Sequence, residues 1–187
     1  MKLCLILMAG ALASAADTKL VFEPAATEVK FTLDTTTHVV HGTFALKSGE
    51  VIFDPATGKA SGQLVVDALS GQSGSGSRDG KMHKSVLESS KYTTVTFVPD
   101  RVEGSVAMSG TSKVQVHGKM NLHGADHELT IPVEVNMESG KATASSHFLV
   151  PFLKWGLKNP SMMFFKVNEN VEIDIRGSAK IASGTKP

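Results

Sequence analysis

The sequence predicts an all-β protein of about eight antiparallel strands, closed into a barrel with one short helix over it. The main observation lies between residues 114 and 135, where apolar and polar residues alternate on both sides of His123-Gly124-Ala125-Asp126. A period of two indicates strands with one apolar and one polar face. The Gly and Asp of the link are typical of a turn between antiparallel strands. Such strands form a sandwich or a closed barrel, and closure is favoured because it removes the sheet edges.

Alternating segments recur along the rest of the chain and are separated by turns rich in Gly, Pro and Asp. In the last of them Val171, Ile173 and Ile175 are expected to face inward. The expected strands are 27–35, 40–46 with a short partner at 51–53, 62–68, 92–98, 101–108, 114–122, 129–137, 142–152 and 167–179.

One segment breaks the alternation. Residues 78–89 place Met82, Val86 and Leu87 on one side of a short helix, with Ser77 or Asp79 as its N-cap. A loop rich in Gly and Ser, 71–77, precedes it.

Residues 1–16 are predicted to be a secretory signal peptide. Lys2 precedes an apolar stretch at 3–12, and small residues follow up to Ala16, which is the pattern of a cleavable export signal. The stretch is too short for a membrane-spanning helix, which needs roughly 20 residues, and a buried first strand is the alternative. Cleavage after Ala15 or Ala16 would place the protein in the periplasm or outside the cell.

The remaining residues, 17–187, are expected to form one domain, since 187 residues with 41% hydrophobic content suit a single core. Loss of Lys2 from the 19 basic residues leaves 18 against 18 acidic ones. A neutral chain argues against nucleic acid or an anionic membrane surface as the main partner, and no integral membrane span is expected. Cys4, the single cysteine, is lost with the signal peptide, so neither a disulfide nor a thiol nucleophile is expected.

No motif predicts catalytic residues, a metal site or a cofactor. His123 and His127 flank the turn and His117 lies on the polar face, so they do not converge as zinc ligands must. Residues 74–81 lack the spacing of a phosphate-binding loop, and Met82 stands where that loop requires Ser or Thr.

The predicted inward faces place small residues beside large ones, as in Gly42 before Phe44 and Gly118 before Met120. Small inward residues favour a cavity, because an eight-stranded barrel is just wide enough for one small ligand. Glycines at barrel corners would instead serve as bends, and the residues leave both interpretations open. A cluster of aromatic and Met residues between 148 and 165 is either a hydrophobic entrance or core packing under a loop.

Six segments, taken together and in order, resemble the YceI family of secreted, lipocalin-like proteins. They are Thr27-Glu28-Val29-Lys30-Phe31, Gly42-Thr43-Phe44, Val51-Ile52-Phe53-Asp54-Pro55, Arg78-Asp79 with Met82, Tyr92 and Phe97, Gly118-Lys119-Met120-Asn121-Leu122-His123-Gly124, and Trp155-Gly156-Leu157. The resemblance covers about residues 20–181 and implies an eight-stranded lipocalin-like barrel that binds a polyisoprenoid or similar amphiphile in an apolar pocket. It implies no catalytic residues and is compatible with a homodimer.

The chain departs from the family pattern at Lys81-Met82, at Thr93 and at Phe152-Leu153-Lys154. The first and third departures are expected near the polar end of the ligand, so the head group is the least transferable feature. Arg78 either contacts that head group or, together with Asp79, caps and pins the helix, because an acidic residue near a helix start is stabilising.

We therefore expect a non-enzymatic protein that binds, transports or stores a polyisoprenoid or other long-chain amphiphile. One alternative is a filled barrel that acts as an interaction module or a stress-related periplasmic protein without ligand, and another is an enzyme acting on an isoprenoid lipid. The residues expected to line the pocket are Phe31, Phe44, Leu64, Phe97, Met120, Leu122, Ile131, Phe148 and Trp155.

Overall fold

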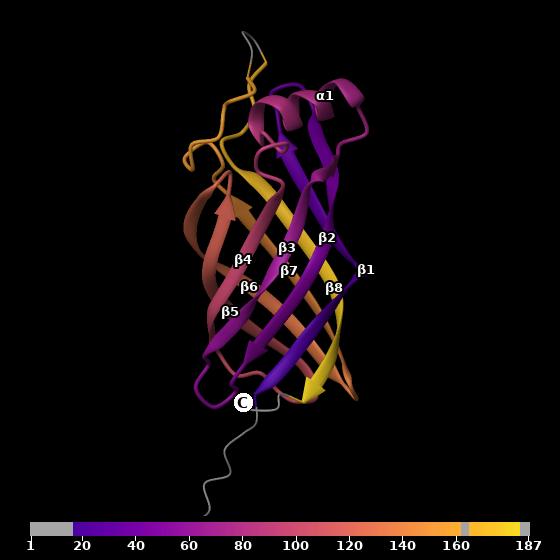
Figure 1. The fold of residues 1–187 in the computed structure, drawn as a ribbon, viewed down its shortest axis with the longest axis vertical. Coiled ribbons are helices and arrows are strands. Elements are labelled where there is room, and N and C mark those ends of the chain that lie inside the picture. The colour runs from indigo at the N-terminus through magenta and orange to yellow at the C-terminus, as the bar shows by residue number, and fades with distance from the viewer. Residues whose placement is uncertain (1–16, 162–164, 184–187) are drawn as a thin grey trace, which may run out of the picture.

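The computed structural model describes residues 17–161 and 165–183, which form one closed antiparallel barrel (Figure 1). Neighbouring strands follow the order of the chain, and β8 closes the barrel on β1. The strands are β1 (Thr18–Asp34), β2 (Val39–Phe53), β3 (Ala60–Gln72), β4 (Thr94–Glu103), β5 (Gly110–Leu122), β6 (Ala125–Glu138), β7 (Lys141–Val150) and β8 (Val171–Ser183). The predicted fold class is confirmed, whereas the signal peptide predicted for residues 1–16 lies outside the described residues.

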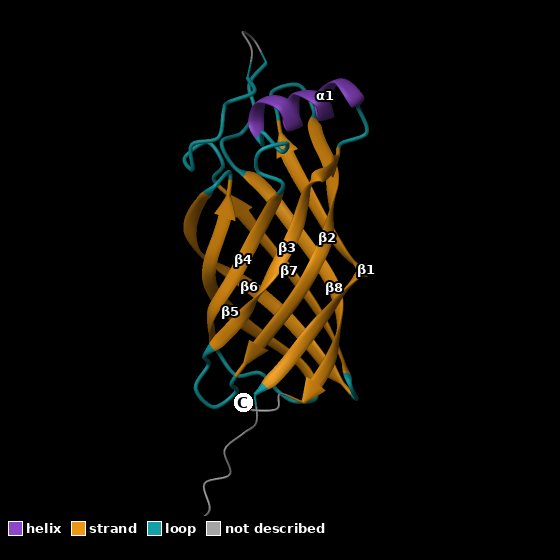
Figure 2. Ribbon diagram, in the orientation of Figure 1, coloured by secondary structure: helices purple, strands orange, loops and turns teal. Residues whose placement is uncertain are grey.

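A short helical segment connects β3 to β4 and lies across one end of the barrel (Figure 2). It consists of α1 (Gly76–Lys81) followed directly by the π-helical turn η1 (Met82–Val86). The predicted helix is therefore confirmed, but the predicted cap is wrong. Ser75 occupies the N-cap position and its side chain makes no capping hydrogen bond.

β1, β2 and β4 continue through a register shift, so each of them is longer than alternation predicts. β2 joins the predicted segments 40–46 and 51–53, and β4 joins 92–98 to the start of 101–108. β1 begins at Thr18 instead of residue 27, with a shift between Val21 and Glu28. A bulge adds one residue to a strand, so the inward side chains change between even and odd positions without ending the strand. The sequence pattern treated each change of parity as a strand end.

The interior contains two clusters of buried apolar side chains. The cluster at the end of the barrel away from α1 includes Met137, which is fully buried. Its other members are Leu20, Phe53, Val102, Val114, Val135, Ala142 and Ala179. The cluster at the helix end comprises Phe97, Met120, Leu122, Ile131, Phe148, Val150, Phe152 and Leu157. The hydrophobic faces of the strands and the loop after β7 are thus buried together.

Inward glycines of the barrel are covered by neighbouring aromatic rings. A Cβ on Gly42 would lie 2.3 Å from ring atoms of Phe31, its partner on β1, and a Cβ on Gly118 would lie 2.9 Å from Cζ of Phe97. These two glycines make room for the rings of Phe31 and Phe97 instead of leaving open space in the barrel. Backbone atoms approach them as closely, which explains the requirement for Gly.

Candidate ligand-binding cavity

The barrel encloses an apolar cavity of about 570 Å³ to which all eight strands contribute side chains. This volume lies within the range of about 300–1,000 Å³ that is usual for ligand sites. The lining is aliphatic and aromatic along the barrel, and its polar members are mostly Ser and Thr. An amphiphile with a long hydrocarbon tail suits such a lining, because burial of each methylene contributes about 0.8 kcal/mol.

Eight of the nine side chains expected to line the pocket do line the cavity: Phe31, Phe44, Leu64, Phe97, Met120, Leu122, Ile131 and Phe148. They come from β1 to β7, and most belong to the buried cluster at the helix end of the barrel. Alternation identified them because every second residue of a strand faces the interior.

Trp155 is the exception, because it is not among the residues that line the cavity. The indole lies flat against the imidazole of His127 on β6, with ring centroids 4.2 Å apart and planes 3° from parallel. It belongs to the loop after β7, where Phe152 and Leu157 are buried and line the cavity instead. His127 Nε2 is buried and has no hydrogen-bond partner within the described residues.

The helical segment supplies lining residues that the expected list omitted. Met82, Val86 and Leu87, which the sequence placed on one side of a helix, line the cavity. The spacing of these residues in the sequence could have predicted that they face the barrel together, because residues three and four apart share a helix face. The segment therefore partly roofs the barrel with an apolar underside (Figure 1).

Arg78 and Asp79 both form hydrogen bonds with Ser73, which lies in the loop that leads into α1. The Arg78 guanidinium donates from Nε to Ser73 Oγ at 2.7 Å and from a terminal nitrogen to the Ser73 carbonyl at 2.6 Å. The Asp79 carboxylate accepts from the Ser73 amide at 2.8 Å and from its hydroxyl. The pair fixes this loop instead of capping the helix, and Arg78 also lines the cavity. Its contact with a head group stays a prediction.

Lys81 ties the helix to the opposite side of the barrel end. Its ammonium group donates to the carbonyl of Pro160, in the loop between β7 and β8, at 2.8 Å. Lys81 is half-buried and, like Arg78, lines the cavity.

The His123-Gly124 turn packs beneath the helical segment. The His123 ring lies 4.3 Å from the Tyr92 ring, and its Nε2 lies 2.6 Å from a carboxylate oxygen of Glu88. A Cβ on Gly124 would lie 2.5 Å from the Tyr92 ring. The turn thus joins the β5–β6 hairpin to the segment after η1, and neither His123 nor His127 lines the cavity.

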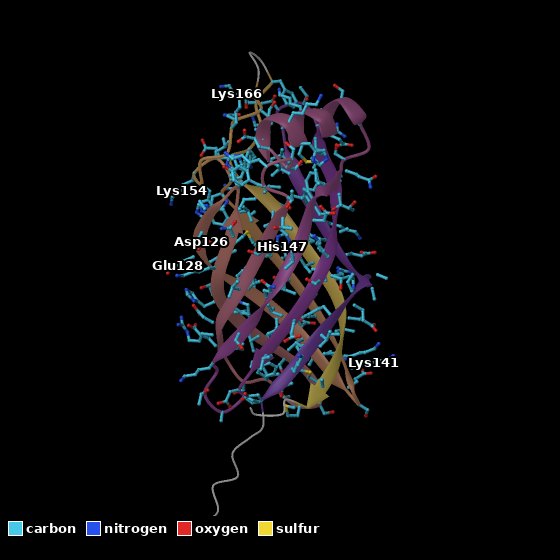
Figure 3. All side chains as sticks on the ribbon, in the orientation of Figure 1. Asp126, Glu128, Lys141, His147, Lys154 and Lys166 are labelled. Carbon is cyan, nitrogen blue, oxygen red and sulfur yellow. The ribbon has the colours of Figure 1, made fainter. Side chains whose placement is uncertain are left out.

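Two carboxyl groups on the outside of the barrel, those of Glu23 and Glu28, have lowered pKa values. A hydrogen bond from Lys180 and its charge lower the pKa of Glu23, and Lys30 lowers the pKa of Glu28 in the same way. Figure 3 shows charged side chains such as Asp126 and Glu128 projecting outward from the barrel.

Across residues 17–161 and 165–183, no group of three or more His, Cys, Asp or Glu side chains is arranged to hold a metal ion. Within the same ranges, no helix has the length and apolar character to cross a membrane.

Known proteins resemble this chain in sequence and in fold. The sequence profile described as the YceI-like domain matches residues 20–179. Among solved structures, BcnA from Burkholderia cenocepacia is similar with a TM-score of 0.68 and 19% identity, over 85% of this chain and 99% of that one. A polyisoprenoid binding domain from Saccharophagus degradans, implicated in plant cell wall breakdown, gives 0.66 and 16%, over 87% and 98%. The YceI protein of Campylobacter jejuni gives 0.53 and 16%, over 79% and 86%. No curated protein sequence matches the chain.

Proposed function

Because the chain belongs to the YceI family and its barrel surrounds an apolar cavity, we propose that it binds a polyisoprenoid or other long-chain amphiphile without catalysing a reaction. The enclosed cavity of about 570 Å³ carries this proposal. A barrel filled by its own side chains would have no such space, so the cavity argues against an interaction module without ligand. The polyisoprenoid binding domain of Saccharophagus degradans supports an isoprenoid tail in particular.

The proposed mechanism is passive. The tail lies among the apolar side chains of the barrel and gains affinity with each methylene removed from water. The protein would carry or store the amphiphile in the periplasm or outside the cell, after removal of residues 1–16. Among the described residues, His38 is the histidine that lines the cavity, and its Nδ1 makes a hydrogen bond with the Thr37 hydroxyl, so it lends no support to the enzymatic alternative.

Native mass spectrometry of protein purified from the export compartment tests the proposal. We expect a mass above that of the processed polypeptide, and a matching lipid in a solvent extract. A bare polypeptide together with an extract free of lipid would contradict ligand binding.

A matched pair of variants locates the bound lipid. Leu122 is buried and lines the cavity, so Leu122→Asp places a charge in an apolar interior and is expected to abolish binding or folding. Val98 is 44% exposed on the outside of β4, so Val98→Asp is expected to retain both. Retention of lipid and stability by Leu122→Asp would show that the ligand lies elsewhere.

A further inference from the structure

The connections between strands carry unequal charge at the two ends of the barrel. Four connections lie at the helix end: residues 35–38, 73–93, 123–124 and 151–170. They contain seven Lys and Arg against three Asp and Glu, a net charge of +4 with His neutral. Three connections lie at the other end: residues 54–59, 104–109 and 139–140. These contain one Lys against one Asp, so their net charge is zero.

Most of the cations at the helix end are accessible from outside the barrel. Five of the seven are exposed lysines: Lys84, Lys91, Lys154, Lys158 and Lys166. Within residues 17–161 and 165–183 none of the five forms a salt bridge. Figure 3 shows Lys154 and Lys166 at the helix end, and Lys141 at the opposite end. The helix end thus presents positive charge that no neighbouring carboxylate pairs with.

Exposed apolar side chains accompany these lysines. Val39 is 51% exposed at the start of β2, Leu69 is 53% exposed near the end of β3, and Leu149 is 51% exposed near the end of β7. All three positions are those at which their strands reach the helix end. Lysines together with exposed apolar groups are typical of surfaces that bind at a lipid interface.

We propose that the helix end of the barrel docks on the surface of an anionic phospholipid bilayer, through the exposed lysines of 73–93 and 151–170 and the apolar side chains beside them. Each lysine close to such a surface raises the affinity about fivefold. Docking needs no occupant of the cavity and therefore goes beyond the proposed function. In this orientation the helix end of the cavity would face the bilayer.

The equal numbers of acidic and basic residues in 17–187 do not oppose docking. At physiological salt the attraction between exposed charges extends only about 8 Å. A bilayer that touches the helix end therefore interacts with the charges of that end, and the acidic residues farther along the barrel are screened. Overall neutrality argues against a charge-driven partner only where the charges are evenly distributed.

Co-sedimentation with vesicles tests the proposal. We expect the native protein to bind vesicles of equal parts phosphatidylglycerol and phosphatidylcholine at least about tenfold more tightly than vesicles of phosphatidylcholine alone. The preference should shrink between 50 mM and 500 mM NaCl, because added salt screens the charges. Equal binding to the two kinds of vesicle, or binding to neither, would overturn docking and leave the proposed function standing.

Two matched triple variants assign docking to one end of the barrel. The first removes the three lysine charges of 151–170: Lys154→Gln, Lys158→Gln and Lys166→Gln. It should bind the anionic vesicles at least about tenfold more weakly. The second removes the same charge from exposed lysines away from the helix end: Lys59→Gln, Lys113→Gln and Lys141→Gln.

The second variant should bind the vesicles as the native protein does. Both variants should unfold at nearly the native urea concentration, because the replaced side chains are exposed. Native vesicle binding by the first variant, or an equal loss of binding in the two variants, would overturn docking through the helix end.

Discussion

At Gly118 the strands β4 and β5 approach so closely that a methyl group has no space. A Cβ there would lie 2.4 Å from the carbonyl oxygen of Val98, 2.8 Å from Cα of Pro99 and 2.9 Å from the ring of Phe97. Two of these neighbours are backbone atoms, which cannot move away as a flexible side chain can. Gly118 therefore leaves the space that the Phe97 ring occupies in the cavity wall.

Gly118→Ala is expected to destabilise the barrel by about 1–3 kcal/mol, the usual effect of overpacking a well-packed interior. Urea unfolding would show a lower midpoint with little change in slope. Gly80→Ala in α1 is the matched control, because a Cβ there meets no atom within 4 Å. The control should be neutral or more stable by about 0.5–1 kcal/mol. Equal stability of the two variants would contradict the close packing at Gly118.

The strands show how far alternation predicts a barrel. The β5–β6 hairpin was predicted well because its register runs without a shift from Leu122↔Ala125 to Gly110↔Met137. β2 was divided because its inward residues change parity between Leu46 and Ser48. A period-two pattern marks a bulge and a strand end in the same way, and the pairing partner that distinguishes them is not local in sequence.

The same reasoning explains what was predicted of the cavity. Phe31 and Ile131 were placed correctly since a strand fixes the side of each side chain. The position of Trp155 could not be predicted because its loop has no period, and its contact with His127 depends on how the loop folds against β6. The sequence alone does not show which end of the barrel the helical segment covers. The contribution of this segment to the cavity lining therefore could not be predicted.

The first half of β6, residues 125–132, contacts the loop after β7. β6 pairs with β7 from Val133↔Ser146 to Glu138↔Lys141, so residues 125–132 pair with β5 alone. The indole of Trp155 stacks on His127 within this half-paired region. The loop after β7 thus contacts β6 in the region where β7 does not pair with it.

Trp155→Ala is expected to loosen this region locally. Aromatic pairs contribute about 0.5–1.5 kcal/mol beyond burial, so amide exchange in residues 125–132 should accelerate about 2- to 10-fold. Residues 133–137, which pair with both β5 and β7, should exchange as before. Hydrogen–deuterium exchange with mass spectrometry measures both, with Lys154→Ala, an exposed position of the same loop, as control. Uniform acceleration along β6 would contradict a local role for the loop.

The whole molecule is a closed sheet around one elongated apolar space. Closure satisfies the strand edges that would otherwise pair with other chains. The cavity extends beside the buried cluster around Met137 as well as the cluster near the helix. Its length, and not a particular contact, is therefore expected to determine which tails bind best.

Prenyl alcohols of increasing length test this expectation. From geraniol to farnesol to geranylgeraniol, affinity should rise with each isoprene unit, by up to about a thousandfold if each of the five added carbons contributes about 0.8 kcal/mol, and level off once the cavity is full. Ala144→Phe, on the inner face of β7, should lower the length at which affinity levels off. Thr143→Phe on the outer face is its control. Affinity independent of tail length would contradict binding inside the barrel.

The cluster around Met137 also has a kinetic consequence. Its members pack together at the barrel end opposite α1, so we expect a tail bound inside the described barrel to leave past the helical segment and the Pro160 loop. Such a tail must enter end first and withdraw one methylene after another. Dissociation would then slow with each added carbon, and delivery to an acceptor would require that acceptor to face the helix end of the barrel.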